Sequence, residues 1–506
     1  MQSKTDVLFV KPNNQKKIFQ DLSKDFSGIE PPLWLILTAA FIKKEGFSVS
    51  VIDAEAENLS TDETLERARK EDPLLVAVLV SGTNPSASTI NMPGAGEFLK
   101  ALHEKGTRAL TVISGLHPSA LPRRTMEETA ADFLIEGEGF YTYRDLISLL
   151  KKGNPKVNDF KVKGLWFRKG KEILSNPRAD NVNDLGVLPM PAWDLLPMDK
   201  YRAHNWHCFS RVDKRTPYAV IYTSLGCPFN CHFCCINSIF GGPGIRYRPV
   251  KDVLSEIEYL VKNYKVKNIK ILDELFALNW KHVEEICDGL INFGFELNIW
   301  VYGRVDTVKD YMLAKMKKAG INWIAYGYEA GSKKVRDGVS KGRFSEKEIK
   351  EITRKTHEAG ISIVANFIFG LPEDDMETMK ETLDLAKDLN CEYANLYCAM
   401  AYPGSRLYED AVKQKLPLPE SWSAFSQFSV DCLPLPTKYI TSAEVLRFRD
   451  AAFDDYFSDP RYLEMIERKF GDSAVNNVKA MREVKLKRKN YTLDNKVYFK
   501  GTMEAI

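Results

Sequence analysis

Short apolar segments alternate with amphipathic helical segments along most of this 506-residue chain, and this alternation limits the possible fold more than any other feature. In the first part of the chain we expect strands over residues 6–10, 48–56, 74–82, 110–115 and 133–139. The helices expected between them cover residues 32–46, 61–71, 96–106 and 141–153. This order of elements predicts βαβ units, and therefore an α/β domain with a doubly wound, Rossmann-like sheet over residues 1–150.

A second alternating series begins near residue 211, and its strands are expected over residues 218–227, 266–273, 297–303, 323–330, 361–370 and 393–400. Six strand–helix units are fewer than the eight that close a complete barrel. The pattern therefore predicts a partial, TIM-type (β/α)6 barrel over residues 211–415, with a site at the C-terminal strand ends. Residues 151–210, which contain a hairpin turning at Lys169-Gly170, are expected to form a linker, and residues 416–506 a helical C-terminal region.

The overall charge and the hydropathy pattern exclude several classes of protein. The chain has 71 Lys and Arg residues against 68 Asp and Glu residues, a balance that argues against binding to a nucleic-acid backbone. No apolar run reaches the length of about 18 residues needed for a membrane span. The N-terminus lacks the apolar core and cleavage site of a signal peptide. We therefore expect a cytoplasmic protein without a membrane span.

Four cysteines gather in the segment SLGCPFNCHFCC, which contains Cys227, Cys231, Cys234 and Cys235. In a chain without an export signal, such a cluster is typical of a metal or redox site rather than of disulfides. Cys227, Cys231 and Cys234 form a C-x3-C-x2-C motif on a strand-end loop, where three thiolates can hold three irons of a [4Fe–4S] cube and leave the fourth iron free. A zinc site would need four closed ligands, usually in two pairs, and the sequence has no second pair. Cys235 is expected to be a bystander.

The C-x3-C-x2-C motif after the first strand of an α/β barrel resembles that of the radical SAM superfamily, and the resemblance extends over about residues 215–415. It implies that S-adenosylmethionine (SAM) binds the open iron through its amino and carboxylate groups. It also implies that an electron from the cluster cleaves SAM to a 5′-deoxyadenosyl radical, and that an external donor such as flavodoxin or ferredoxin supplies this electron.

The same resemblance indicates which residues contact SAM. Phe233 stands before the last cluster cysteine, where the family has an aromatic residue near the adenine. Glu329 in YGYEAGS would accept hydrogen bonds from the ribose hydroxyls, for which an acceptor-only carboxylate is suited. Arg304 in YGRVD would bind the SAM carboxylate, and Gly370 in NFIFGLPED would lie close to the adenine. An internal ion pair between Glu329 and Arg304 is the structural alternative.

One family motif is missing from the second barrel strand. The Gly-Gly-Glu segment that binds the SAM amino group in the family is replaced here by ILDELFALN. The resemblance therefore leaves two candidates for the amino group, Asp273 and Glu274.

The N-terminal segments PPLWLILTAAFIKKEGFSVSVIDAEAE and SGLHPSALPRRTMEETAADFLIEGEG resemble the cobalamin-binding domain fused to one large branch of radical SAM enzymes. The D-x-H-x-x-G motif that supplies a histidine to cobalt in corrinoid methyltransferases is absent, so we expect the lower face of the cobalt to be open or covered by a side chain. Candidate cobalamin contacts are Trp34, Asp53, Ser81, Gly82, Thr83, Gly115, His117, Pro118, Glu136, Gly137 and Glu138. A domain that has lost its corrinoid is the alternative.

Together, the two resemblances imply a cobalamin-dependent radical SAM C-methyltransferase, which uses one SAM to remethylate cobalamin and a second to generate the radical that activates an unactivated carbon. An oxidative cyclase or ring-rearranging enzyme without methyl transfer is the nearest alternative, and a corrinoid-binding or redox-sensing protein is the non-enzymatic one. A methylthiotransferase would need a second cysteine triad, and the first 200 residues contain no cysteine. The substrate is expected to be a small molecule or natural product, with Tyr397, Cys398 and Tyr402 at the mouth of the barrel.

Overall fold

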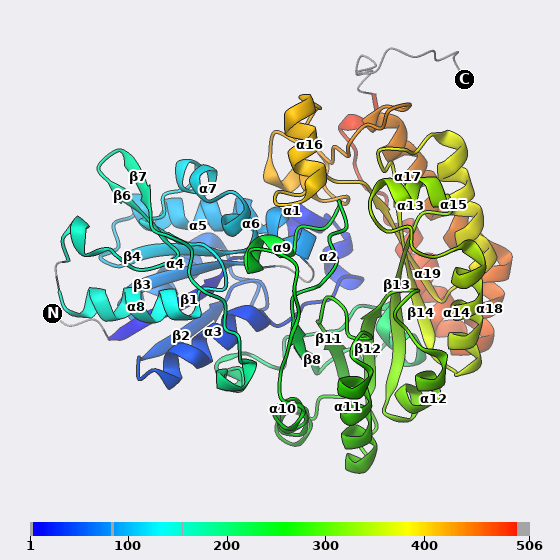
Figure 1. Cartoon of the computed structure of the whole chain (residues 1–506), viewed down its shortest axis with the longest axis horizontal. Coiled ribbons are helices and arrows are strands. Elements are labelled where there is room, and N and C mark those ends of the chain that lie inside the picture. Colours follow the sequence, from blue (N-terminus) through cyan, green and yellow to red (C-terminus); the bar gives the residue numbers. More distant parts are fainter. Residues whose placement is uncertain (1–3, 82–84, 154, 493–506) are drawn as a thin grey trace.

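The computed structural model describes residues 4–81, 85–153 and 155–492, and it confirms the predicted fold class. Two α/β units lie side by side, as Figure 1 shows, with the first unit in blue to cyan and the second in green to yellow. No helix in the described part of the chain is long and apolar enough to cross a bilayer.

The first unit is built on a seven-stranded sheet with the strand order β2-β1-β3-β4-β5-β6-β7. Strands β1 to β5 are parallel, and the β6–β7 hairpin joins β5 in antiparallel register. The strands are β1 (Thr5–Lys11), β2 (Val49–Asp53), β3 (Pro73–Val80), β4 (Leu110–Gly115), β5 (Phe133–Ile135), β6 (Leu165–Lys169) and β7 (Glu172–Ser175). The hairpin that the sequence assigned to a linker is thus part of this sheet.

Helices cover both faces of the first sheet, as a doubly wound topology requires. The core on one face packs against α3 and α8, and the core on the other face against α4 and α5. The longer helices are α3 (Leu33–Lys44), α4 (Thr61–Glu71), α5 (Met92–Glu104) and α8 (Phe140–Lys151). The short helices are α1 (Gln15–Phe19), α2 (Leu22–Asp25), η1 (Pro85–Asn91), α6 (Leu116–Ala120) and α7 (Pro122–Glu128).

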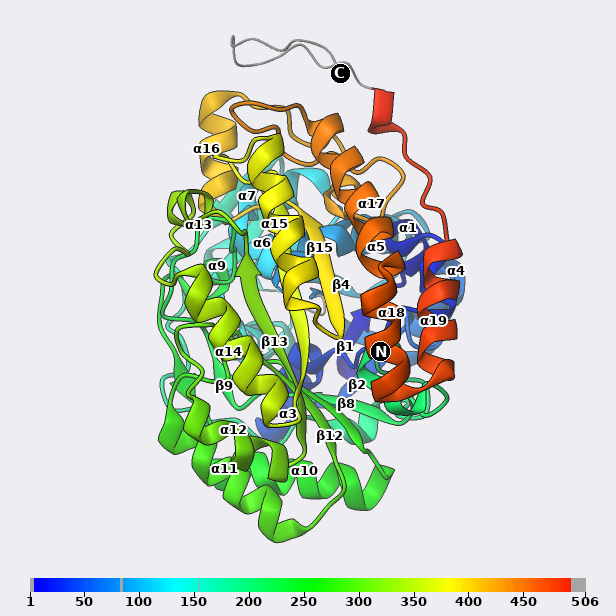
Figure 2. The same ribbon diagram turned by 90° about the vertical axis from the view of Figure 1, so that its right-hand side faces the viewer.

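The second unit is a six-stranded, fully parallel sheet in which spatial order follows chain order, so the sheet curves into a partial barrel (Figure 2). Its strands are β8 (Tyr218–Ile221), β11 (Asn268–Ile271), β12 (Asn298–Gly303), β13 (Ile321–Glu329), β14 (Ser362–Phe369) and β15 (Tyr393–Cys398). The main helices are α10 (Val250–Tyr264), α11 (Trp280–Phe293), α12 (Asp310–Lys318), α14 (Glu346–Glu358) and α15 (Met376–Leu389). A short β9–β10 hairpin (Ser224–Leu225, Arg246–Tyr247) and the helices α9 (Asn237–Phe240) and α13 (Lys333–Gly338) lie in the strand-end loops.

The segment before the barrel closes the floor of the barrel. Trp206, in the 3-10 helix η5 (Trp206–Arg211), packs its ring 5.1 Å from that of Trp300 and 5.4 Å from that of Trp323. His207 forms a hydrogen bond of 3.0 Å between its Nε2 and the carbonyl oxygen of Asn298. The end of the barrel opposite the C-terminal strand ends is therefore filled with aromatic side chains.

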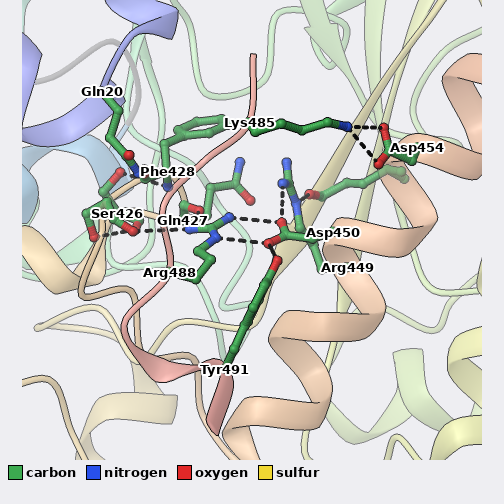
Figure 3. Close-up of polar contacts among 12 residues, drawn as sticks. Gln20, Ser426, Gln427, Phe428, Arg449, Asp450, Asp454, Lys485, Arg488 and Tyr491 are labelled. Carbon is green, nitrogen blue, oxygen red and sulfur yellow. Dashed lines mark hydrogen bonds and ion pairs between the residues drawn. The ribbon is translucent and has the colours of Figure 1, made fainter. Parts of the chain in front are cut away.

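The C-terminal region is helical and contains α16 (Arg406–Gln414), α17 (Ser442–Ser458), α18 (Pro460–Phe470) and α19 (Asp472–Glu483). After α19 the chain runs back along α17 (Figure 3), where Arg488 donates from Nε and Nη2 to Asp450, at 2.9 Å each. Arg488 also donates to the backbone oxygen of Gln427 (2.7 Å), and Gln20 of the first unit donates to that of Phe428 (2.6 Å). The C-terminal segment thus ties both units together.

Candidate functional site

A cavity with about 600 Å³ of empty space, part of it open to solvent, lies where the C-terminal strand ends of the two sheets meet. In open α/β sheets, ligands bind at this edge of the sheet. The cavity is lined by Trp34, Leu79, Val80, Ser81, Ser88, Gly115 and Leu116 from the first unit, and by Tyr222, Ser224, Leu225, Gly226, Ile236, Ile239, Phe240, Leu272 and Glu274 from the second. Three predicted cobalamin contacts and one predicted SAM contact therefore share one space.

On the first unit, the wall of the cavity is built from backbone and small side chains. Gly115 has φ +123°, and a Cβ atom there would stand 2.1 Å from the carbonyl oxygen of Val80, so no larger residue fits. Ser88 donates to the same carbonyl oxygen (2.7 Å). Trp34 closes this wall, and its ring lies 6.1 Å from that of Tyr222 on the second unit. The predicted contacts Gly82 and Thr83 lie outside the described residues.

On the second unit, the wall leads into the cysteine loop. Gly226 has φ +91°, and a Cβ atom there would stand 2.4 Å from the carbonyl oxygen of Gly244. The Gly244 N–H in turn donates to the carbonyl oxygen of Cys227 (3.0 Å), and the Cys234 N–H to that of Cys231 (3.0 Å). The loop is therefore held by its own backbone at the edge of the cavity.

All nine cysteines are free thiols. Cys227 and Cys234 are partly exposed, whereas Cys231 is buried beside the guanidinium of Arg304. Cys235 is 1% exposed and lies within the apolar core. Burial raises the pKa of the Cys227 thiol to about 11 and that of Cys235 to about 12. Among the described residues, no three His, Cys, Asp or Glu side chains converge on the position of a single metal ion. A cube distributes its thiolate ligands over separate irons, so it does not require such convergence.

The two carboxylates after β11 have different surroundings. Asp273 is 1% exposed and accepts hydrogen bonds from the Thr223 N–H (2.6 Å) and the Ser224 hydroxyl (2.7 Å), so its oxygens are already engaged. Glu274 lines the cavity, and burial together with the charge of Asp273 raises its pKa to about 8. Of these two predicted candidates, Glu274 is the one whose carboxyl group is available to a ligand.

The two charged residues expected to bind SAM do not pair with each other. Arg304, at the end of β12, donates from Nε and Nη2 to Asp306, at 2.9 Å each, and from Nη1 to the Cys231 sulfur at 3.6 Å. Glu329, at the end of β13, forms an ion pair with Lys341 (2.9 Å). The alternative of an internal ion pair between Glu329 and Arg304 is therefore wrong, because each residue has a different partner near the cysteine loop.

Of the remaining predicted SAM contacts, Phe233 lies within this loop and Gly370 directly follows β14. Phe233 is partly buried and packs against two small apolar clusters, with the Lys341 ammonium 5.9 Å from the centre of its ring. Gly370 has φ +81°, and a Cβ atom there would stand 2.5 Å from the Val445 side chain of α17. Close packing against a helix therefore accounts for this glycine.

Asp53, His117 and Pro118, three predicted cobalamin contacts, do not line the cavity. Asp53 is 1% exposed and accepts a hydrogen bond from the Tyr201 hydroxyl (2.9 Å). Pro118 is buried in the short helix α6. His117 is fully buried, with Nδ1 3.0 Å from the Thr89 hydroxyl and its ring 4.5 Å from that of Trp422. Burial lowers the pKa of His117 to about 3, so the imidazole is neutral.

The predicted contacts Glu136, Gly137 and Glu138 do not line the cavity, and the two glutamates instead connect the two units. Glu136 pairs with Arg178 (3.0 Å), whose Nη2 also donates to a backbone oxygen of α9 (2.6 Å). Glu138 pairs with Arg246 of β10 and accepts the Val182 N–H (2.7 Å). Gly137 has φ +91° and donates its N–H to the Ser119 hydroxyl (2.9 Å).

The three residues expected at the barrel mouth lie in different places. Tyr397 is partly buried in the structure, and burial raises the pKa of its phenol, with a smaller contribution from Glu329. Cys398 is 4% exposed and packs in the core, because buried and partly buried residues alternate along β15 and Cys398 belongs to the buried set. Cys398 therefore does not line the mouth. Tyr402 donates to the carbonyl oxygen of Phe425 (3.1 Å).

Several residues of the site were not singled out from the sequence. Asp306 and Lys341 pair with the predicted Arg304 and Glu329, and Thr223 holds Asp273. Asp306 stands two residues after Arg304 in the motif YGRVD, and this spacing could have predicted the ion pair between them. Lys341 lies in the SKGR segment, which carries no recognisable pattern.

Comparisons with known proteins agree with this division of the chain. The model of the Radical SAM superfamily matches residues 221–386, and that of the B12 binding domain matches residues 21–147. An uncharacterized methyltransferase of Pyrococcus horikoshii is 28% identical over 434 residues, which cover 86% of this chain and 89% of the relative. An anaerobic magnesium-protoporphyrin IX monomethyl ester cyclase of Cereibacter sphaeroides is 30% identical over 410 residues, 80% of this chain and 63% of the relative.

Solved structures share the fold. The radical S-adenosylmethionine methyltransferase TsrM from Kitasatospora setae, with tryptophan and a SAM analogue bound, superposes with a TM-score of 0.66 at 17% identity, covering 94% of this chain and 98% of that one. The cobalamin-dependent S-adenosylmethionine radical enzyme OxsB, with aqua-cobalamin and SAM bound, gives a TM-score of 0.69 at 16% identity, covering 95% and 70%.

Proposed function

Because this chain belongs to the radical SAM enzymes that carry a B12-binding domain, we propose that it is a cobalamin-dependent methyltransferase that methylates an unactivated carbon of a small molecule or natural product. The observation that carries this proposal is the shared cavity, which brings the strand ends of the B12-binding unit and the cysteine-loop wall of the barrel into one space. A site at which two cofactors act on one substrate atom requires such a juxtaposition.

The cofactors of this family are a [4Fe–4S] cluster, SAM and cobalamin. The chemical groups present at the site, which are thiols, a carboxyl group and strand-end backbone, are of the types that bind these cofactors. When bound, the cluster with SAM supplies a carbon-centred radical and cobalamin supplies the methyl group. Cys227, Cys231 and Cys234 would hold the cluster, since they are free thiols on one loop beside the cavity. Ser81 and Gly115 would contact the corrin, since their backbone lies open at the strand ends.

The other residues of the site position ligands and exclude water. Glu274 would accept a hydrogen bond from the SAM amino group, while Asp273 keeps the strand-end backbone in place through Thr223. Glu329, held by Lys341, would accept from the ribose hydroxyls. Trp34 contributes to an apolar wall that keeps bulk water from the space between the two units. An external one-electron donor, such as flavodoxin or ferredoxin, would reduce the cluster.

Two relatives support methyl transfer, but they do not identify the substrate of this chain. Besides the methyltransferase of Pyrococcus horikoshii, a cytidylyl-2-hydroxyethylphosphonate methyltransferase of Streptomyces wedmorensis is 23% identical over 433 residues. The magnesium-protoporphyrin ester cyclase, at 30% identity, favours the second candidate, an oxidative cyclase that transfers no methyl group.

The two candidates are separated by the fate of SAM in the reconstituted protein under anaerobic conditions. We expect incubation with SAM, cobalamin and dithionite to give 5′-deoxyadenosine together with S-adenosylhomocysteine and a methylated corrinoid, all measured by mass spectrometry. Deoxyadenosine without S-adenosylhomocysteine would favour the cyclase. Formation of neither product by a protein that has bound cluster and cobalamin would refute both candidates.

The buried position of His117 leads to a prediction for cobalt ligation. Its Nδ1 contacts Thr89, and its Nε2 has no hydrogen-bond partner among the described residues but is fully buried, with the Trp422 ring 4.5 Å from the imidazole, so burial keeps this nitrogen from the cobalt of a ligand in the cavity. We expect the electron paramagnetic resonance spectrum of protein-bound cob(II)alamin to show no histidine nitrogen coupling. The spectrum of His117→Gln should be the same as that of the wild type, and a spectral change confined to this variant would contradict the assignment.

A further inference from the structure

The guanidinium of Arg304 joins a cluster cysteine to a carboxylate. Its Nη1 donates to the Cys231 sulfur at 3.6 Å, while Nε and Nη2 make two parallel bonds of 2.9 Å to Asp306. The guanidinium carbon lies 3.8 Å from the centre of the Phe229 ring, and the Arg304 side chain is 6% exposed. The forked pair and the stacked ring leave the guanidinium little freedom to turn away from the sulfur.

The charges around this cysteine come in two matched pairs. Arg304 is paired with Asp306, and Lys341, a second cation that acts on Cys231, is paired with Glu329. Each carboxylate cancels part of the positive charge that the sulfur would otherwise experience. In a buried setting these interactions are only weakly screened by solvent.

We propose that Arg304 and Asp306 act as a pair that sets the reduction potential of the cluster bound through Cys231. Hydrogen bonds to the sulfurs and nearby charge are among the factors that set such potentials. Reduction adds one negative charge to the cluster, so the Arg304 donor stabilises the reduced form. Asp306 opposes this effect while it orients the guanidinium. The inference rests on the proposed cluster site and assigns Arg304 a role that precedes SAM binding.

The test is a redox titration of the reconstituted full-length protein without SAM, with dithionite as the one-electron donor and electron paramagnetic resonance as the readout. We expect Arg304→Gln to lower the equilibrium constant for reduction about tenfold, a shift of about 59 mV toward more negative potential. Asp306→Asn is expected to shift the potential in the opposite direction, because it leaves the charge of Arg304 uncompensated. Lys309→Gln removes one positive charge from an exposed position nearby, and it should leave the potential unchanged.

Opposite shifts from two adjacent substitutions are not expected from a purely structural role. Unchanged potentials, or shifts in the same direction, would overturn the inference. So would an Arg304→Gln variant that differs from the wild type only in SAM affinity. If Arg304→Gln does not retain the cluster, the reduction potentials of Asp306→Asn and Arg304→Lys decide. Arg304→Lys keeps the positive charge but loses the two parallel hydrogen bonds to Asp306. Failure of the wild type itself to bind iron and sulfide would instead count against the proposed cluster site.

Discussion

Replacing Cys227, Cys231 or Cys234 with alanine is expected to remove the iron–sulfur cluster and abolish SAM cleavage. Each thiolate of the triad would hold one iron, and no other described cysteine is placed on this loop except Cys235. We expect the wild type reconstituted under anaerobic conditions to contain about four irons and four sulfides per chain. The single variants should lose most of this content and yield no 5′-deoxyadenosine.

Cys235 provides the matched control, because it is adjacent to Cys234 but 1% exposed within the apolar core. Cys235→Ala removes one sulfur atom from that core and should retain the iron, the sulfide and the SAM cleavage. An equal loss of iron in the Cys234 and Cys235 variants would show that the ligand assignment is wrong. A cluster that persists in the triple variant, or zinc in place of iron and sulfide, would refute the site as a whole.

Local sequence signals identified most elements of the fold but not all of their ends. The helix expected over 61–71 is observed with the same bounds, because Ser60 and Glu63 form a capping box that fixes its start. The strand expected over 48–56 stops at Asp53, whose carboxylate accepts the Ala56 N–H and turns the chain. That bond depends on the folded turn, and hydropathy alone does not reveal it.

Motifs identified candidate site residues, whereas their partners required the tertiary structure. The radical SAM and cobalamin resemblances are confirmed by the two family models. The alternation along β15 shows that Tyr397 and Cys398 point in opposite directions, but not which of them faces inward. Likewise, the motifs YGRVD and YGYEAGS place Arg304 and Glu329 at strand ends, and an ion pair between them was the structural alternative. Arg304 instead pairs with Asp306 of its own motif, whereas Glu329 pairs with Lys341, which lies in a segment without a distinctive pattern.

At a pH above 8, where Glu274 is ionised in the free protein, Glu274→Gln is expected to weaken SAM binding at least about tenfold, because the cavity would lose the carboxylate that accepts from the SAM amino group. Asp273→Asn is the matched comparison. This substitution removes the charge of the residue adjacent to Glu274 and weakens the hydrogen bonds that Asp273 accepts from Thr223 and Ser224. It should therefore lower the unfolding temperature more than it changes the affinity for SAM. Both are measured on cluster-loaded, unreduced protein by anaerobic calorimetry and thermal unfolding.

The pH dependence of this effect distinguishes a ligand role for Glu274 from a structural one. Burial and Asp273 raise the pKa of Glu274 to about 8, so below that pH the free protein carries a neutral carboxyl that resembles glutamine. Binding that prefers the carboxylate lowers this pKa, so the wild type should gain affinity over Glu274→Gln as the pH rises toward 8. Above that pH the advantage should level off. The ratio of the two dissociation constants cancels the titration of the SAM amino group itself, which is common to both proteins. If the ratio of the two dissociation constants is near one at every pH, or if Asp273→Asn loses more affinity for SAM than Glu274→Gln does, Glu274 does not bind the SAM amino group.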